Sequence, residues 1–498
     1  MKILIHIYSI TLSFLLQVFF YILASVIWLR LNRFFDIIIF VEKNEIYEGI
    51  AEAVAGGGEG IIKVDGVAVF VPFCLTGERV RFQILKADKK AAYGKIIEIL
   101  SPSEERVIPR CPVFGKCGGC DLQHMSYSAQ LSFKRKTVEN TLKKIGGIDF
   151  PVGNTVASGE EYGYRNKCAL PVGVINGETV CGFYAPRSHR IVPVDGCDIQ
   201  AEWIKNVISS LKKFFSTGVK GYDEATKKGD IRHAVVREIG GKFIFALVVT
   251  HVLDTSFLVA ELKKNFKEFT LLLNINTADG NAIFGREWRT VYGGGFFGAE
   301  EQGIKYKAGA NTFIQVNDGM RSKLYSAVLK EAEEGTAAID LYSGGGLLTA
   351  MLAKKCGLAY GIEIVEEASR CADELKRENN LDGKMFNICG KVEDEINAVF
   401  QKTAGKRIIV CDPPRKGMEK SVVYAVKNSD ANKIVLISCN PATLARDLGL
   451  LTGSLIEKDG ALVKCESPVS DYEIESITPF DMFPQTKHVE TLAVLKRK

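Results

Sequence analysis

The stretch "TAAIDLYSGGGLLTAMLAKK" (residues 336–355) contains a short apolar run, three successive glycines and a second apolar run. This order predicts a buried strand, a glycine-rich turn and a helix. The glycines at 344–346 let the backbone approach a ligand closely and leave the N–H groups of the helix start open to it. One such turn is a weak signal, because many α/β proteins use it for packing alone.

Acidic residues lie at the ends of three predicted strands in this region. Asp340 ends the strand before the turn, Glu363 lies near the end of "LAYGIEI", and Asp412 ends "KRIIVCD". Because the carboxyl ends of parallel strands meet at one edge of a sheet, we expect the three carboxylates to line one crevice. Glu363 lies where a carboxylate can bind the two hydroxyls of a ribose. The alternative is that these residues only cap neighbouring helices.

None of these strands leads into a G-x-G-x-x-G dinucleotide motif or a G-x-x-x-x-G-K-[ST] phosphate-binding loop. A nucleoside cofactor without a phosphate chain therefore fits the pattern better. This favours S-adenosylmethionine.

The chain is predicted to be multidomain. Helices and strands alternate over 306–498, which is typical of a doubly wound, Rossmann-like α/β domain. Mixed periodicity over 101–305 predicts an α+β central domain. Short alternating runs broken by glycines over 41–100 predict a small, OB-like β-barrel.

Residues 1–40 form an apolar segment, with no charged residue between Ile3 and Leu29. It is long enough to span a bilayer, and Arg30 and Arg33 would then place the rest of the chain in the cytoplasm. The alternatives are a mis-assigned start, with translation beginning at Val41, and, less favoured, a cleaved signal peptide. A membrane is a partner only if this segment is truly translated.

Composition sets broad limits on the class of protein. Hydrophobic residues make up 47% of the chain and charged residues 25%, which fits a folded protein rather than a disordered one. The net charge of +5 permits a nucleic-acid partner without arguing for one. The 13 cysteines are scattered, which favours a reducing compartment and hence the cytoplasm.

Cys439 follows the apolar run "KIVLI", beside the predicted cofactor strand, in the stretch "SCNPATLARD". It is either a small core residue or a nucleophile presented to a cleft. Methylation of a nitrogen or oxygen needs no covalent help from the enzyme. Carbon 5 of uracil is a poor nucleophile and must first be activated by addition of a thiolate at carbon 6. The proton on carbon 5 must then be removed by a base, and Glu490 in "DMFPQTKHVETLAVL" supplies one.

Together, "DPPRKG", "SCNPATLARDL" and "DMFPQTKHVE" resemble the RNA uracil-5-methyltransferase family, closest to the bacterial 23S ribosomal RNA enzymes. The resemblance covers Val41 to Lys498 and is most specific in the last third. It implies Cys439 as nucleophile and Glu490 as base. It also implies contacts to S-adenosylmethionine, from residues listed here: Gln315, Tyr342, Glu363 and Asp412.

Two positions depart from the family pattern. The glycine turn reads "DLYSGGG" where the family usually has "DLYCGVG", and Ser343 removes a thiol that has no catalytic role. In "CGKVED", Lys391 stands where members often have an acidic or amide residue, so the adenine contact is left open.

Three cysteines cluster in "CPVFGKCGGCDLQH", as Cys111, Cys117 and Cys120, and Cys197 in "VPVDGCDIQ" can supply a fourth thiolate. Four thiolates fit zinc or an iron–sulfur cluster. Three clustered ligands and one remote ligand suit a cubane better than zinc, which is usually held by two C-x2-C pairs. The resemblance implies a [4Fe-4S] cluster at these four positions.

Basic residues interleaved with aromatic ones indicate RNA contacts. Arg165, Asn166 and Lys167 follow Tyr162 and Tyr164 in "EYGYRNKCALPV". Such a pattern suits phosphate neutralisation and base stacking on an unpaired strand, although an ordinary amphipathic strand pair gives it too. The barrel at 41–100 resembles the RNA-binding TRAM domain.

The sequence therefore predicts an enzyme that forms 5-methyluridine in 23S ribosomal RNA, on an unpaired or loop uridine, with no obligate protein partner. A tRNA uracil-5-methyltransferase is the main alternative, disfavoured by the barrel and the cysteine cluster. A non-catalytic RNA-binding assembly factor is disfavoured by the presence of both Cys439 and Glu490. A small-molecule methyltransferase is disfavoured by the barrel.

Overall fold

The computed structural model describes residues 41–88 and 91–498. The described residues form two compact units, one of 41–54 with 59–103, the other of 55–58 with 104–498. In these ranges no helix combines the length and the apolar character needed to cross a lipid bilayer. The three interpretations of residues 1–40 concern a segment outside the described residues.

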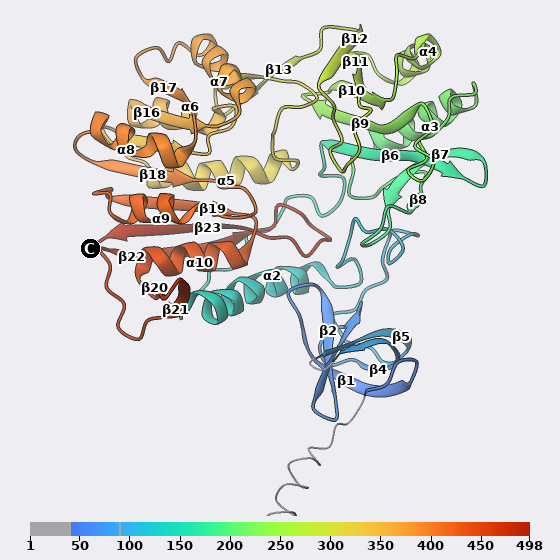
Figure 1. Ribbon diagram of the computed structural model, residues 1–498, viewed down its shortest axis with the longest axis horizontal. Helices are drawn as coiled ribbons and strands as arrows, with labels where there is room; N and C mark the ends of the chain where they lie inside the picture. Colours follow the sequence, from blue (N-terminus) through green and yellow to red (C-terminus); the bar gives the residue numbers. More distant parts are fainter. Residues whose placement is uncertain (1–40, 89–90) are drawn as a thin grey trace, which may run out of the picture. The chain divides into compact units, whose positions relative to one another are not determined.

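The first unit is a closed barrel of five strands in the order β1-β2-β3-β5-β4 (Figure 1). The strands are β1 (Ile46–Val54), β2 (Glu59–Val64), β3 (Val67–Pro72), β4 (Arg79–Asp88) and β5 (Ala91–Ser101). Apolar side chains at alternate positions, such as Val69 and Val71, point inward and are fully buried. The barrel predicted near the N-terminus is confirmed.

The second unit contains a seven-stranded sheet in its middle part, in the order β12-β11-β10-β9-β6-β7-β8. Its strands are β6 (Lys167–Ile175), β7 (Glu178–Tyr184), β8 (Ile191–Pro193), β9 (Ile231–Ile239), β10 (Lys242–Val249), β11 (Phe269–Ile275) and β12 (Glu287–Tyr292). Two helices, α3 (Trp203–Phe215) and α4 (Ser256–Asn265), pack against it. A hairpin of β13 (Phe297–Glu301) and β14 (Ile304–Ala308) follows.

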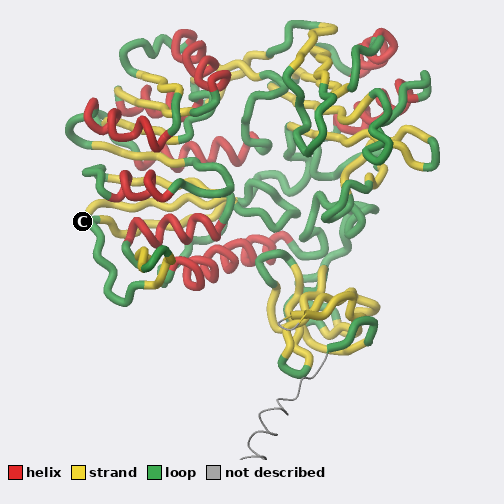
Figure 2. The backbone as a smooth tube through the Cα atoms, in the orientation of Figure 1, coloured by secondary structure: helices red, strands yellow, loops and turns green. Residues whose placement is uncertain are grey.

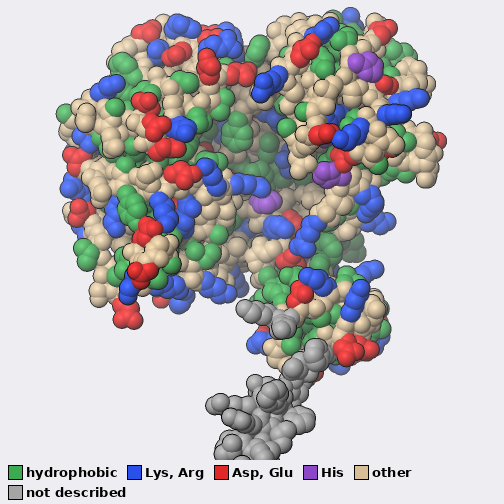
Figure 3. Space-filling view, in the orientation of Figure 1, with side chains coloured by type: hydrophobic (Ala, Val, Ile, Leu, Met, Phe, Trp, Pro, Cys, Tyr) green, Lys and Arg blue, Asp and Glu red, His purple; other side chains and the backbone are tan. Residues whose placement is uncertain are grey.

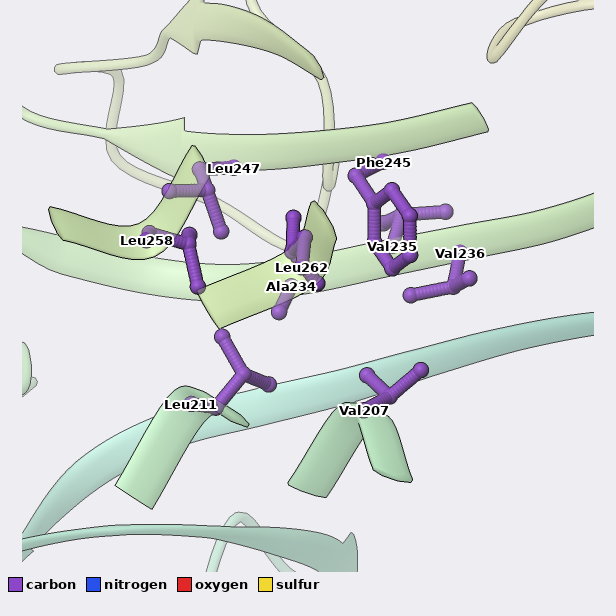
Figure 4. Close-up of a pocket in the computed structure, with 9 residues that line it drawn as sticks. All are labelled: Val207, Leu211, Ala234, Val235, Val236, Phe245, Leu247, Leu258 and Leu262. Atoms are coloured by element: carbon purple, nitrogen blue, oxygen red, sulfur yellow. The ribbon is translucent and has the colours of Figure 1, made fainter. Parts of the chain in front are cut away.

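A small space lies between this sheet and its two helices (Figure 4). Val207 of α3 and Leu258 of α4 face it, opposite Phe245 of β10. All the residues that line it are apolar, which suits hydrophobic packing rather than a binding site for a polar ligand.

The C-terminal part of this unit is a second seven-stranded sheet, in the order β17-β16-β15-β18-β19-β23-β22. Its strands are β15 (Ala337–Leu341), β16 (Leu358–Glu363), β17 (Met385–Cys389), β18 (Arg407–Cys411), β19 (Lys433–Ser438), β22 (Tyr472–Phe480) and β23 (Glu490–Arg497). The first five in this order are parallel, and β23 and β22 add an antiparallel pair. The doubly wound sheet predicted for this region is present.

Helices cover both faces of this sheet, and Figure 2 shows them alternating with its strands. One face carries α5 (Asp318–Glu331), α6 (Leu347–Cys356) and α7 (Glu366–Glu378). The other carries α8 (Val392–Lys402), α9 (Lys420–Lys427) and α10 (Pro441–Thr452). A short hairpin of β20 (Leu455–Lys458) and β21 (Ala461–Lys464) follows α10.

The helix α2 (Tyr127–Thr141) and the π-helical turn η1 (Leu142–Gly146) precede the middle sheet in the chain but pack with the C-terminal one. Val138 and Leu142 share a hydrophobic cluster with Leu444 of α10. The Ser454 hydroxyl donates a hydrogen bond of 2.7 Å to the carbonyl of Gly146. A segment from the predicted central domain thus helps to build the core of the C-terminal domain.

Candidate active site

The glycine turn after β15 is closed on one side and open on the other. Gly346 has a φ of 79°, and a Cβ atom there would lie 2.6 Å from the Ala372 Cβ of α7. Only glycine fits such a position without a shift of its neighbours. At Gly344 and Gly345 an added Cβ would meet nothing within 4 Å. The open side therefore leaves room for a ligand beside the start of α6.

Glu363, at the end of β16, accepts a hydrogen bond from this turn with one carboxylate oxygen and from the segment after its own strand with the other. Its Oε2 accepts a hydrogen bond from the Gly344 N–H at 2.9 Å, and its Oε1 accepts one from the Val365 N–H at 2.7 Å. Beside it, the apolar side chains of Ile364 and Val365 are more than half exposed. This combination suits a nucleoside, because a carboxylate can accept hydrogen bonds from ribose hydroxyls and apolar side chains can pack against the base.

The three carboxylates predicted to converge do so. Burial raises the pKa of Asp340 to about 7, and the charges of Asp412 and Glu363 add to this effect, whereas a hydrogen bond from Thr349 opposes it. Burial also raises the pKa of Asp412 to about 7, although this residue as a whole is not fully buried. At this edge of the sheet, burial thus disfavours the charged forms of Asp340 and Asp412.

Cys439 and Glu490 come from adjacent strands. Cys439 follows Ser438, the last residue of β19, which pairs with Thr491 of β23, and Glu490 begins β23. Burial raises the pKa of the Cys439 thiol, and the Glu490 charge raises it further. Burial and the Asp412 charge hold the pKa of the buried Glu490 carboxyl well above its usual range. The predicted nucleophile and base therefore lie close enough for the Glu490 charge to oppose ionisation of the Cys439 thiol.

Asn440 explains how Cys439 is presented. Its side chain accepts a hydrogen bond from the Ala442 N–H at 3.1 Å and so caps α10, where Pro441 is the first residue. The Asn440 amide also donates to the Arg415 carbonyl at 3.0 Å. A strand end, a cap and a proline thus fix the backbone on both sides of the cysteine.

Arg415 is a site residue that the sequence analysis missed. Its guanidinium lowers the pKa of Cys439 through its charge and a hydrogen bond, and it also lowers the pKa of Glu490. The loop that carries it is held by α10, since the Arg446 side chain donates to the Met418 carbonyl at 2.7 Å and Asp447 accepts from the Met418 N–H at 3.0 Å. Its position three residues after Asp412, in "DPPRKG", was the available signal.

The segment around Gln315 is fixed from two sides. The Asn166 side chain donates to the Gln315 carbonyl at 3.3 Å and to Asp318 at 2.8 Å. Asn317 caps α5 and donates to the carbonyl of Met482 at 3.2 Å. Gln315 is 9% exposed, whereas Phe313 is 78% exposed and was not singled out from the sequence.

The three residues predicted to contact RNA differ in their surroundings. Asn166 is buried and engaged with the Gln315 segment, as above. Burial lowers the pKa of Lys167 to about 8. The backbone of Arg165 bridges to Gln200 and to Asn317. Figure 3 shows a hollow on the surface of the second unit, with Lys and Arg side chains along its edge.

The four cysteines predicted to bind a metal cluster are brought together. Burial raises the pKa of the Cys120 thiol to about 12, and charges on Cys197, Cys117 and Cys111 raise it too. Burial likewise raises the pKa of Cys197 to about 11, with contributions from Cys117 and Cys111. The Gly119 N–H donates a hydrogen bond of 3.4 Å to the Cys117 sulfur.

Within 41–88 and 91–498, no three His, Cys, Asp or Glu side chains are arranged to hold a metal ion. The donor set itself, four cysteine thiols, is of the type that binds either zinc or an iron–sulfur cluster.

A doubly wound sheet of this order, with a glycine turn after its first strand and a carboxylate after its second, is typical of S-adenosylmethionine-dependent methyltransferases. A family model described as tRNA (uracil-5-)-methyltransferase matches residues 126–498, and the chain belongs to this family. It is an RNA methyltransferase.

Its relatives agree with this assignment. An uncharacterized RNA methyltransferase of Clostridium acetobutylicum is 36% identical over 473 residues, covering 92% of this chain and 99% of the relative. One of Halalkalibacterium halodurans is 35% identical over 467 residues, covering 92% and 98%. The Pyrococcus abyssi tRNA (uracil-54, C5)-methyltransferase, solved with S-adenosyl-L-homocysteine, has a TM-score of 0.71 at 24% identity, covering 90% of this chain and 99% of that one. This last similarity supports the fold.

Proposed function

We propose that this enzyme methylates carbon 5 of a uridine in 23S ribosomal RNA, through a covalent adduct between Cys439 and carbon 6 of the uracil. The observation that carries the proposal is the pairing of a partly exposed thiol with a buried carboxyl on adjacent strands, beside Arg415. Methylation of a nitrogen or an oxygen would need no covalent addition of a thiolate to the base.

Cys439 acts first. Its thiolate adds to carbon 6, and the electron pair of the C5–C6 double bond moves into the ring carbonyl at carbon 4, as an enolate. Arg415 favours this step because its positive charge stabilises the thiolate. S-adenosylmethionine would supply the methyl group: carbon 5 would attack it, the bond from the methyl carbon to the sulfonium would break, and S-adenosylhomocysteine would leave with the electron pair.

Glu490 acts second. Carbon 5 then carries both a methyl group and a proton, and the Glu490 carboxylate removes the proton. The C–H electron pair re-forms the C5–C6 double bond, the C6–S bond breaks, and the thiolate is regenerated. A carboxylate with a raised pKa is a stronger base than an ordinary one, which suits this step.

For the cofactor, we propose that Glu363 contacts the ribose hydroxyls of S-adenosylmethionine. Other parts of the same molecule are contacted by Asp412, Tyr342 and Gln315. The open side of the turn at Gly344 and Gly345 supports this placement. For the RNA, we propose direct contacts from Arg165 and Lys167. Asn166 acts indirectly, through the Gln315 segment that its side chain holds. The exposed ring of Phe313 is suited to stacking on an unpaired base.

For Cys111, Cys117, Cys120 and Cys197, we propose a [4Fe-4S] cluster. The electrostatic influence of these thiols on one another supports it, together with the sequence pattern of three clustered cysteines and one remote one. The reaction above moves no net electrons, so a structural role suits the cluster better than a redox role.

The choice of RNA rests on the resemblance of the motifs to the 23S enzymes and on the four-cysteine set. A tRNA uridine is the second candidate, favoured by the description of the family model. The barrel does not separate the two: residues before Glu104 make up about a fifth of the chain, so the 90% alignment with the Pyrococcus tRNA enzyme includes some of them.

Mapping of 5-methyluridine by mass spectrometry, in ribosomal and transfer RNA from a deletion strain and its parent, tests the proposal. We expect loss from one 23S position, restored by the parent gene but not by a Cys439→Ala variant. Loss from tRNA alone would keep the chemistry and replace the substrate. If no position loses its methyl group, the uridine proposal is wrong.

A further inference from the structure

The loop between β22 and β23, residues 481–489, ends at the proposed base. Phe480 and Glu490 pair directly across the two strands, so the loop leaves the sheet and returns at the same place. Since Glu490 is the first residue after the loop, the path of the loop sets the direction in which its carboxyl points.

Gln485 is the residue by which this loop is held. It is buried and has a φ of 69°, a conformation that costs a residue other than glycine about 1 to 2 kcal/mol. Its N–H donates to the Gln130 side chain at 2.9 Å, and its side-chain oxygen accepts from the Gln130 amide at 3.0 Å. Its carbonyl accepts from the N–H groups of Asp121 and Leu122 at 3.1 and 3.0 Å. Four hydrogen bonds, two with Gln130 of α2 and two with the loop residues Asp121 and Leu122, offset the strain.

Further contacts join the same two segments. The Lys487 ammonium lies 3.3 Å from the Asp121 carboxylate, and both side chains are about one-third exposed. The Lys134 ammonium of α2 forms a fully buried ion pair with Asp481 and donates to the Phe483 carbonyl at 3.0 Å. The partners of the loop thus lie on α2 and on the residues that directly follow Cys120.

We propose that Gln130, Gln485 and Asp121 are positioning residues that couple the cysteine-bearing segment to the loop of Glu490. The inference rests on the proposed role of Glu490 as the base. It also rests on the proposed cluster and assigns it a function: by binding Cys117 and Cys120, the cluster would fix residues 117–122, on which the base-bearing loop is seated. The nucleophile does not depend on this surface, because Cys439 is fixed by β19 and α10.

The test uses Gln130→Met in the full-length protein, a change that keeps side-chain length and removes the hydrogen bonds. We expect faster amide hydrogen exchange in residues 481–489. With an RNA substrate, we expect near-parental formation of the covalent adduct but a resolution step slowed roughly 10- to 100-fold, so that adduct accumulates. Asn140→Ala, an exposed amide on the same helix, is the matched control and should change neither readout.

Three further variants keep the test decisive. If Gln130→Met does not fold, Asp121→Asn removes only the partly exposed charge pair and should show the same pattern more weakly. Cys120→Ser should increase exchange in the same loop peptide, a readout that needs no activity. In a double-mutant cycle, Gln485→Met should add little to Gln130→Met, because the two side chains act through each other.

Specific outcomes would overturn the inference. If Gln130→Met resolves the adduct at the parental rate, or slows adduct formation and resolution equally, the network does not position the base and contributes only to general stability. Glu490→Gln separates this from a failure of the proposed function: if that variant accumulates no adduct, the base assignment itself is wrong.

Discussion

At Cys439, opposing charges set the ease of thiolate formation. Burial and Glu490 raise its pKa, and Arg415 lowers it. We therefore expect Arg415→Met to slow adduct formation roughly tenfold near pH 7, with recovery as the pH rises toward 10, because more thiolate then forms without help. Single-turnover trapping of the adduct across this range measures the effect. Lys416→Met, an exposed neighbour paired with Glu419, should keep the parental pH dependence.

At Glu490, loss of the carboxylate blocks only the second half of the reaction. In Glu490→Gln we expect the methylated protein–RNA adduct to form and persist, visible as a gel-stable complex. Cys439→Ala, which lacks the nucleophile, should form none and yet bind S-adenosylmethionine. A Glu490→Gln enzyme that turns over at the parental rate would contradict the role of this residue.

At Asp340, the raised pKa links stability to pH. The pKa is about 7 in the folded chain, whereas an unfolded Asp titrates near about 3.9. The folded state therefore holds this proton more tightly, and stability falls as the pH rises from about 4 to 7. Asp340→Asn has no proton to lose. Its stability relative to the parent should increase over this window, by at most about 1.4 kcal/mol per pH unit.

Thermal or urea unfolding of Asp340→Asn and the parent at pH 5.5 and 7.5 gives this comparison. The pH-dependent difference reports the loss of the Asp340 proton together with the easier ionisation of Asp412, because the variant removes the neighbouring Asp340 charge. An advantage of the variant that is the same at both pH values would show that Asp340 ionises as easily in the folded chain as in the unfolded one.

At the scale of elements, the glycine turn makes one position irreplaceable. Gly346→Ala would bring a Cβ to 2.6 Å from Ala372 and force an unfavourable φ. We expect a loss of about 2 kcal/mol or more in stability, together with weaker S-adenosylmethionine binding. Gly345→Ala, in open space, should keep the parental melting temperature. Equal melting temperatures for both variants would contradict this account.

The elements also show what sequence patterns could and could not predict. The alternation of strands and helices was enough to predict the doubly wound sheet. Once the strands are parallel, it also predicts that Asp340, Glu363 and Asp412 converge, because each follows or ends a strand. Asn166 has no such signal, since its burial depends on contacts with residues about 150 positions away. Arg415 lay inside a motif that was noted, but its nearness to Cys439 depends on how α10 holds the loop.

At the scale of the whole molecule, the barrel has its own core and forms a separate compact unit. We expect a chain reduced to residues 104–498 to keep its S-adenosylmethionine affinity and lose at least about tenfold in RNA affinity. The salt dependence of RNA binding should weaken as well, because fewer phosphate contacts release fewer counterions. Unchanged RNA affinity would show that the barrel takes no part in binding.

The packing of α2 against the C-terminal sheet has a consequence for synthesis on the ribosome. This helix is made early, but the strands β22 and β23 that complete its surroundings are the last to be translated. The barrel can fold as soon as it emerges, whereas the catalytic core must wait for the final residues of the chain. A prematurely terminated product that lacks β23 has neither a finished core nor the proposed base, so we expect it to leave RNA unmodified.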